Sequence, residues 1–452
     1  MVVLKILSFI VGLCFAAAVA VAALAWRSSI DPIARPEAKG FEAENVKHGA
    51  VLAAMGDCKT CHTVPGGRPF AGGLRVPTPF GSIYSTNITP DPSTGIGSWS
   101  EQAFRRALRE GVDREGRQLY PAFPYDHFTL LSDEDIAALY AFLMTREAVP
   151  ATAPPNELPF PLSIRPIIAG WKLLFFREGP YRADPSRGET QNRGAYLVAG
   201  IAHCGACHTP RNALGEEATH DAFAGGDVEG WAAYALNAAS PSPLPWSSDA
   251  LRTYLRHGWQ RDHGVASGPM APVIDNLAAV PESDLAAMVT YLSGLLGEPS
   301  AERLRTAKAR IERAQSAPEL GALPVDWPAS GQPAGALIYR SACASCHDSA
   351  RPPPYGGINL ALSTAPNAPD ARNVINIVLW GVPPAAGERS PIMPGFANVL
   401  SDQQLGQLLD YLRSQFSGKP AWTNLEQDIR EARNLTPSVP PPPARAANTG
   451  AS

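Results

Sequence analysis

The sequence lacks most of the features that would let it act as an enzyme by itself. Its 452 residues contain no nucleotide-binding motif and no residue pattern that would hold a molybdenum or quinone cofactor. Basic stretches are missing too, and the formal net charge of −4 gives no reason to expect nucleic acid as a partner. Cysteine is scarce: there are seven, and six fall in one repeated motif, which excludes a network of structural disulfides.

The repeated motif is Cys-x-x-Cys-His, at residues 58–62, 204–208 and 343–347. It matches the pattern for attaching haem c, in which two thiols add to the vinyl groups of one haem and the histidine supplies an axial nitrogen to the iron. Zinc sites do not require a histidine after every cysteine pair, and a redox dithiol would occur once. The sequence therefore predicts three covalently bound haem c groups. The residues that hold them are Cys58, Cys61, His62, Cys204, Cys207, His208, Cys343, Cys346 and His347.

One long uncharged run lies at the N-terminus, over residues 6–26. At about 20 residues it is long enough to span a bilayer as a helix, and longer than the usual apolar core of a signal peptide. Ala23, Leu24 and Ala25 nevertheless fit a cleavage site. Residues 1–26 are therefore predicted to be a membrane anchor or a signal. Both alternatives place the rest of the chain at the periplasmic side of the inner membrane.

An internal repeat surrounds the three motifs. A short helical stretch that contains Gly-Ala precedes each motif, and a second helix, which ends at a glycine, follows it. The end glycines are Gly111, Gly258 and Gly381. The first two of these helices follow a Trp-Ser pair, and its serine is a natural N-cap, Ser100 or Ser247. A third helix closes each repeat, with acidic residues or glutamine in its first turn.

The repeat predicts a mainly α-helical chain of three tandem domains, with Pro- and Gly-rich loops. The helix order resembles the class I cytochrome c fold, in which terminal helices pack together and the chain wraps one haem. The expected domains are residues 42–150, 187–297 and 330–418, with linkers at 151–186 and 298–329. The second linker contains a charged helical stretch, and residues 437–452 have the composition of a disordered tail.

The first linker carries an aromatic and aliphatic run at residues 170–176. This run is too short to cross a bilayer. Three alternatives remain open for it: contact with a membrane surface, docking of a partner subunit, or packing between domains.

The sixth iron ligand is expected to differ among the repeats. Met270 and Met393 lie among Pro and Gly residues shortly before the last helix of the second and third repeats, where a thioether ligand would raise the reduction potential. The first repeat has Phe123 at this place, and a phenyl ring cannot bind iron. His127, four residues later, is the predicted ligand, and the alternative is an open or water-filled position.

Residues 49–412 resemble the triple-haem cytochrome c subunit of membrane-bound bacterial dehydrogenases, best known as the partner of quinoprotein alcohol dehydrogenase. Residues 85–91, 94–100 and 119–122 carry the resemblance, together with residues 164–166 and Trp171. Phe123 departs from the alcohol dehydrogenase type, which has Met there. In this respect the chain looks more like cytochrome subunits that accompany molybdenum hydroxylases acting on aldehydes or on N-heterocycles such as nicotinate.

The resemblance implies a path for the electrons and a hydrogen-bond acceptor for the axial histidines. The haems would carry electrons from a catalytic dehydrogenase subunit, a molybdenum hydroxylase or a quinoprotein, to ubiquinone or a terminal oxidase at the membrane. By likeness to single-haem relatives, the carbonyl of Pro65 or Pro210 would accept the second N–H of the axial imidazole. The third repeat has no proline at this place.

Two hypotheses of different classes follow. In the first, the chain is a non-catalytic electron-transfer subunit of an oxidoreductase complex. In the second, it is a haem peroxidase or another small-ligand enzyme that uses an open first haem. A haem sensor would need a signalling domain, and the sequence shows none.

Overall fold

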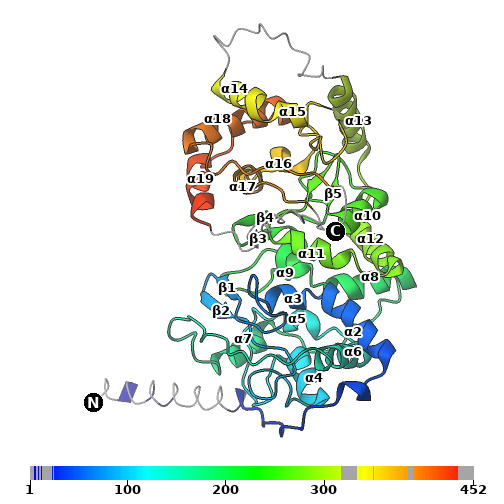
Figure 1. Cartoon of the computed structure of the whole chain (residues 1–452), viewed down its shortest axis with the longest axis vertical. Coiled ribbons are helices and arrows are strands. Elements are labelled where there is room, and N and C mark those ends of the chain that lie inside the picture. Colours follow the sequence, from blue (N-terminus) through cyan, green and yellow to red (C-terminus); the bar gives the residue numbers. More distant parts are fainter. Residues whose placement is uncertain are drawn as a thin grey trace, which may run out of the picture. The chain divides into compact units, whose positions relative to one another are not determined.

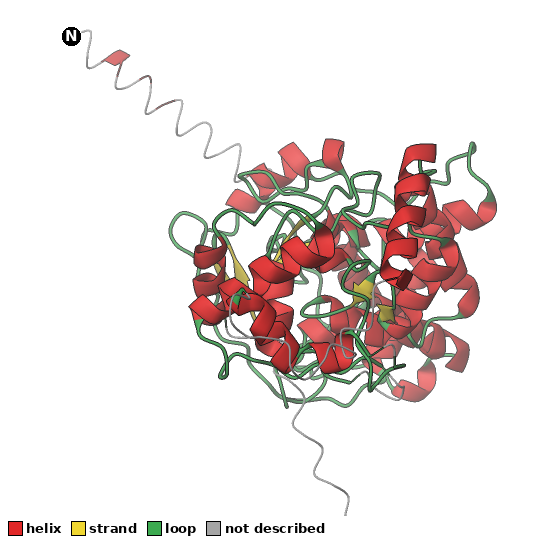
Figure 2. Cartoon of the chain, turned by 90° about the horizontal axis from the view of Figure 1, so that it is seen from above, coloured by secondary structure: helices red, strands yellow, loops and turns green. Residues whose placement is uncertain are grey.

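The computed structural model describes residues 5–6, 9, 12, 23, 25–316, 333–349, 351–384 and 390–435. Helices make up most of its regular structure (Figure 2), as predicted, and the strands of this part form three two-stranded antiparallel sheets. The tail at 437–452 and most of the N-terminal uncharged run lie outside the described residues. Within them, no helix combines the length and the apolar character needed to cross a membrane.

The chain divides into two compact units. Unit 1 holds Met1–Ala206 with Ala213–Glu216, and unit 2 holds Cys207–Asn212 with Glu217–Ser452. The boundary therefore falls inside the second motif. The bounds of the three expected haem domains stay a prediction.

In unit 1 the first and last helices of the first repeat pack along each other, as in the expected fold. They are α2 (Ala43–Met55) and α6 (Asp133–Met144), and α4 (Glu101–Glu110) also packs on α6 (Figure 1). Gly49 permits this approach, because a Cβ atom there would overlap the carbonyl of Ala138. The other elements of this unit are η1 (Ala38–Gly40), α3 (Cys58–Cys61), β1 (Arg75–Thr78), β2 (Gly81–Tyr84), α5 (Tyr125–Phe128), α7 (Ile167–Phe175) and α8 (Glu189–Ala199). The helix α9 (Gly205–His208) contains the boundary.

Unit 2 repeats the helix pairing around the third motif. There α14 (Ala334–Ala342) packs along α18 (Asp402–Leu412), and a Cβ atom on Gly335 would overlap the carbonyl of Gln407. The remaining elements up to the third motif are η2 (Thr219–Asp221), β3 (Gly226–Val228), β4 (Trp231–Ala233), α10 (Ser248–His257), β5 (Trp259–Gln260), β6 (Gly264–Val265), α11 (Met270–Leu277), α12 (Glu282–Leu296) and α13 (Ala301–Ser316). After these come α15 (Ala344–His347), α16 (Thr364–Asn367), α17 (Arg372–Trp380), the π-helical turn η4 (Arg413–Ser417) and α19 (Leu425–Asn434).

Local signals set the helix ends where the sequence predicts them. The Ser100 hydroxyl accepts a hydrogen bond from the Ala103 N–H at 3.2 Å, and Ser247 caps α10 in the same way. Gly111 and Gly258 end these helices with φ of 62° and 77°, a conformation that favours glycine.

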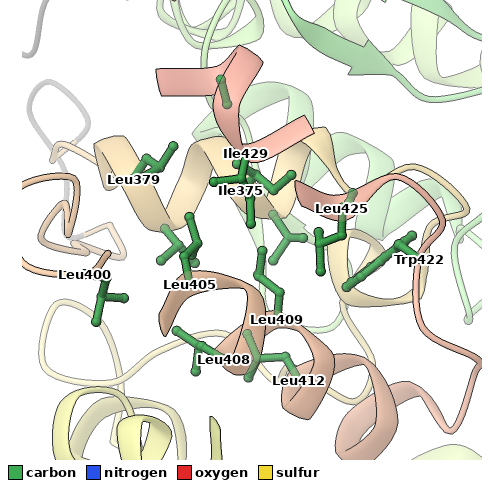
Figure 3. Packing of buried hydrophobic residues seen from close by; sticks show 14 of the residues in the cluster. Ile375, Leu379, Leu400, Leu405, Leu408, Leu409, Leu412, Trp422, Leu425 and Ile429 are labelled. Atoms are coloured by element: carbon green, nitrogen blue, oxygen red, sulfur yellow. The ribbon is translucent and has the colours of Figure 1, made fainter. Parts of the chain in front are cut away.

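A hydrophobic cluster organises the region of the third motif. Side chains from α17, α18 and α19 meet in it (Figure 3), among them Ile375, Leu409 and Ile429, which are almost fully buried. The expected third domain ends at residue 418, and this cluster continues past that bound through Trp422 and Leu425.

Candidate haem sites

Each Cys-x-x-Cys-His motif is built around a one-turn helix: α3 ends one residue before His62, and α9 and α15 begin one residue after Cys204 and Cys343. Residues three apart in a helical turn lie on the same side of it. The two cysteines of a motif can therefore face one porphyrin, with the histidine at the end of the turn. A longer helix, α2, α8 or α14, precedes each motif and fixes its start.

The three motif histidines share one hydrogen-bond pattern. Nδ1 faces a main-chain carbonyl in every case, at 2.6 Å for His62 with Thr86, 2.6 Å for His208 with Tyr234, and 3.1 Å for His347 with Ile358. A carbonyl oxygen can only accept, so Nδ1 carries the proton and Nε2 keeps its lone pair. Burial lowers the pKa of all three imidazoles, which favours the neutral form that binds iron.

These partners correct the expectation for Pro65 and Pro210. Thr86 and Tyr234 take the place that the proline carbonyls were expected to hold, and the Pro210 carbonyl instead accepts the Ala218 N–H at 2.7 Å. The physical reason is a chain reversal after each motif, which brings in a more distant segment of the chain.

Pairs of glycines make this reversal. The Gly72 N–H donates to the His62 carbonyl at 2.8 Å, and the Gly225 N–H donates to the His208 carbonyl at the same distance. In the third motif the Gly357 N–H donates to the Cys346 carbonyl at 3.0 Å, and a Cβ atom on Gly357 would lie 2.6 Å from Nδ1 of His347. At Gly357 the reversal therefore needs glycine, because a side chain would displace His347, and at Gly72 a Cβ atom would instead overlap the backbone of Thr86.

A short hairpin follows the glycines in the first two motifs and ends next to the accepting carbonyl. The hairpin β1–β2 ends at Tyr84, two residues before Thr86, and β3–β4 ends directly before Tyr234. These residues were not predicted from the sequence. A signal was present, since Phe-Ala-Gly-Gly occurs at residues 70–73 and again at 223–226. In both copies the phenylalanine N–H donates to the threonine that follows the axial histidine, at 3.1 Å.

The expected sixth ligands lie in different local structures. Met270 begins α11 and Met393 forms a bridge with Val382, and both thioether side chains are half-buried. Phe123 packs against Phe128 with ring centroids 5.3 Å apart. His127 is buried on α5, and its Nδ1 lies 2.7 Å from the Ala199 carbonyl. The roles of Met270, Met393 and His127 as iron ligands stay predictions.

The residues present fit haem c. Besides the thiols and the imidazole nitrogens, Ser267 has a buried hydroxyl with no hydrogen-bond partner in the described part of the chain, three residues before Met270. A buried hydroxyl of this kind suits the carboxylate of a haem propionate. Bound haem iron supplies a one-electron couple, and the protein's part is to fix the axial nitrogen and to set the polarity around the iron.

Comparison with known proteins places the chain in a family. The family model for cytochrome c matches residues 46–147 and 333–416. A nicotinate dehydrogenase subunit of Pseudomonas putida is 45% identical over 91% of this chain, which spans about a third (34%) of that protein's length. The gluconate 2-dehydrogenase cytochrome c subunit of Pantoea cypripedii is 36% identical, with 86% of this chain and 89% of the relative covered. For the alcohol dehydrogenase (quinone) cytochrome c subunit of Gluconobacter oxydans, the identity is 34% and the coverage is 86% and 82%.

These relatives confirm the resemblance drawn from the motifs. Two of them match over more than four fifths of their own length, so the similarity extends well beyond the haem-binding residues. The chain belongs to the family of multihaem cytochrome c subunits of dehydrogenases.

Proposed function

We propose that this chain is the triple-haem electron-transfer subunit of a dehydrogenase complex, with one haem c at each motif in three tandem cytochrome c domains. One observation carries the proposal: all three motif histidines donate Nδ1–H to a main-chain carbonyl and keep Nε2 for a metal. A motif that had lost its haem would have no reason to keep this arrangement.

The electrons enter from a catalytic partner subunit. The names of the relatives, cytochrome subunits of dehydrogenases, support such a partner. Phe123 and the 45% identity to a nicotinate dehydrogenase subunit favour a molybdenum hydroxylase over a quinoprotein. The acceptor is ubiquinone or a terminal oxidase.

The proposed place of work is the periplasmic side of the inner membrane. Support comes from the uncharged run at residues 6–26 and from haem c attachment, which suits an exported chain. The alternative of a peroxidase with an open first haem is not favoured, because the relatives carry the names of electron-transfer subunits.

The haem count tests the first part of this proposal. The full chain, produced with a cytochrome c maturation system, is expected to carry three haems by pyridine haemochrome assay and intact mass. Each double variant, Cys58→Ala with Cys61→Ala and its equivalents at the other motifs, should lose one haem. A wild-type chain with two haems, or a double variant that keeps all three, would contradict the count.

Co-purification from the native membrane tests whether the chain has a catalytic partner subunit. The tagged chain should co-purify with a catalytic subunit, and adding that subunit's substrate should reduce the haems of the complex. If the purified chain alone oxidised an alcohol or aldehyde, the electron-transfer role would be wrong.

A further inference from the structure

Helix α7 in the first linker has its apolar side outside and its charge inside. Lys172 is the only charged residue of this helix, yet it points into unit 1. Ile167, Leu173 and Leu174 are instead exposed, with 36%, 58% and 64% of their surface accessible. A helix on the surface of a water-soluble protein shows the opposite arrangement, with polar side chains toward the solvent.

The turn before α7 extends the apolar surface. Phe160 is 82% exposed and Ile164 is 42% exposed. We call Phe160, Ile164, Ile167, Leu173 and Leu174 the linker patch. None of these side chains has a polar atom, so the patch offers nothing for a hydrogen-bonded interface and suits contact with hydrocarbon.

Lys172 fixes the direction of the patch. Its Nζ donates to the carbonyls of Glu110 and Gly111, at 2.6 and 2.7 Å, and to Oε1 of Gln118 at 2.7 Å. Three acceptors match the three N–H groups of an ammonium. Rolling α7 to hide the patch would break all three hydrogen bonds, so the apolar face stays outward.

Gln118 also holds the end of the N-terminal uncharged run. Its Nε2 donates to the Ala25 carbonyl at 3.0 Å, and nearby Arg106 donates to the Ser28 carbonyl at 2.7 Å. A single side chain therefore joins Lys172 of α7 to the point where the run enters unit 1. The linker patch and the end of the run belong to one local structure.

The surroundings of this junction suit a lipid headgroup region. Trp26 is 79% exposed, and Arg27 and Arg177 are exposed at the end of the run and directly after α7. Exposed tryptophan and arginine beside apolar side chains are typical of the interface between a bilayer and water.

We propose that the linker patch lies in the surface layer of the membrane that the N-terminal run enters, and so gives unit 1 a second, monotopic contact with lipid. This inference rests on the proposed membrane location. The second contact would hold unit 1 against the bilayer, instead of leaving it on a single tether.

The test compares two labelled positions on the full haem-loaded chain. Leu174→Cys and, as the matched control, Leu304→Cys are made in a Cys14→Ser background and labelled with an environment-sensitive fluorophore. Leu304 is apolar, lies on α13 and is 51% exposed. The chains are incubated with vesicles of phosphatidylethanolamine and phosphatidylglycerol that contain a lipid with a nitroxide quencher near the headgroup. Flotation measures binding separately.

We expect the chain to float with the vesicles and the label at Leu174 to be quenched at least about threefold more than the label at Leu304. Equal quenching of the two labels on floating chains would overturn the inference and leave the membrane location intact. A label at Leu174 that is protected only after the catalytic subunit is added, without lipid quenching, would overturn it in favour of protein docking. Chains that do not float would refute the membrane location itself.

Discussion

At the scale of single residues, the first repeat differs from the others at the predicted sixth iron ligand. Phe123 cannot bind iron, and His127 is buried with its Nδ1 hydrogen-bonded to a carbonyl, as at the three motif histidines. His203 shows the same hydrogen bond, with the Ile201 carbonyl at 3.0 Å, so the role of His127 as a ligand stays a prediction.

If His127 is the sixth ligand, His127→Ala should convert one of the three proposed haems, about one third of the signal, from low-spin to high-spin ferric iron. Absorption and EPR spectra of the oxidised full chain measure this change. Adding Phe123→Met should restore the low-spin state, because a thioether replaces the imidazole. Exposed His220→Ala is the control. A wild-type first haem that is already high-spin, or an H127A chain that stays fully low-spin, would show that His127 is not the ligand.

His263 is expected to make the stability of the fold depend on pH. His263 is 5% exposed, stacks on Trp246 with ring centroids 3.7 Å apart, and lies 2.9 Å from the Ser242 hydroxyl through Nδ1. Burial lowers its pKa to about 4 from an ordinary value of 6.5. The unfolded chain therefore binds the proton more tightly than the folded chain between these two values.

The contribution of neutral His263 to the free energy of unfolding should accordingly be complete above pH 6.5. The free energy of unfolding should then fall by about 3 kcal/mol as the pH approaches 4. His263→Phe keeps a ring against Trp246 and removes the titration, so its stability should depend less on pH in this window. Denaturant titrations of both chains at pH 7 and pH 4.5 measure the difference. An unchanged pH dependence in the variant would refute the assignment, and His220→Gln serves as the exposed control.

At the scale of elements, the glycines of the repeated Gly-Ala pairs explain how the terminal helices approach. Gly335 on α14 touches the backbone of α18, where a Cβ atom would overlap the Gln407 carbonyl. Gly406 lies on α18 itself, but a Cβ atom there would find only Ile429 Cδ1, at 3.9 Å. The two positions form a matched pair of helical glycines.

Gly335→Ala should lower the free energy of unfolding by about 1–3 kcal/mol, because the two helices must move apart. Gly406→Ala should leave it unchanged or raise it by up to about 1 kcal/mol, through higher helix propensity. Thermal or denaturant unfolding followed by circular dichroism compares the two. Equal effects in the same direction would mean that the close approach does not limit the packing.

The elements also show what could be predicted from the sequence. Helix ends were predictable because their signals are local: Ser100 caps α4 through its own side chain, and Gly111 ends it through its own backbone. The carbonyls that accept a hydrogen bond from the motif histidines were not predictable. Thr86 reaches His62 only after a hairpin whose strands have four residues each. Strands this short give too few alternating residues to be recognised. The extension of the third cluster through α19 was missed for a similar reason, because no local signal in α19 shows that this helix packs on α17 and α18.

At the scale of the whole molecule, unit 2 contains the axial histidine of the second motif and the whole third motif. Asn373 of α17 joins the two regions, because its side chain makes hydrogen bonds to both the main-chain N–H and the main-chain carbonyl of Ala232 in β4. The Ala232 N–H donates to its Oδ1 at 2.9 Å, and its Nδ2 donates to the Ala232 carbonyl at 2.8 Å. Ala232 lies two residues before Tyr234, whose carbonyl accepts the Nδ1–H of His208. Asn373 thus connects the third region to the axial histidine of the second.

Loss of this connection should change the reduction potential of the proposed second haem. Asn373→Leu keeps the approximate volume but removes both hydrogen bonds to Ala232, so β4 is held less firmly although Asn376 still donates to the Gly230 carbonyl, and the hydrogen bond from His208 to Tyr234 weakens. A more weakly held N–H makes the imidazole a poorer donor to iron and stabilises the ferric state less. We expect the potential of this haem to rise by some tens of millivolts in a spectroelectrochemical titration, with the other two unchanged. Gln427→Ala, on the exposed side of α19, controls for general damage to unit 2. If all three potentials stay at their wild-type values, then Asn373 serves packing alone, and the haem regions of unit 2 are tuned independently of each other.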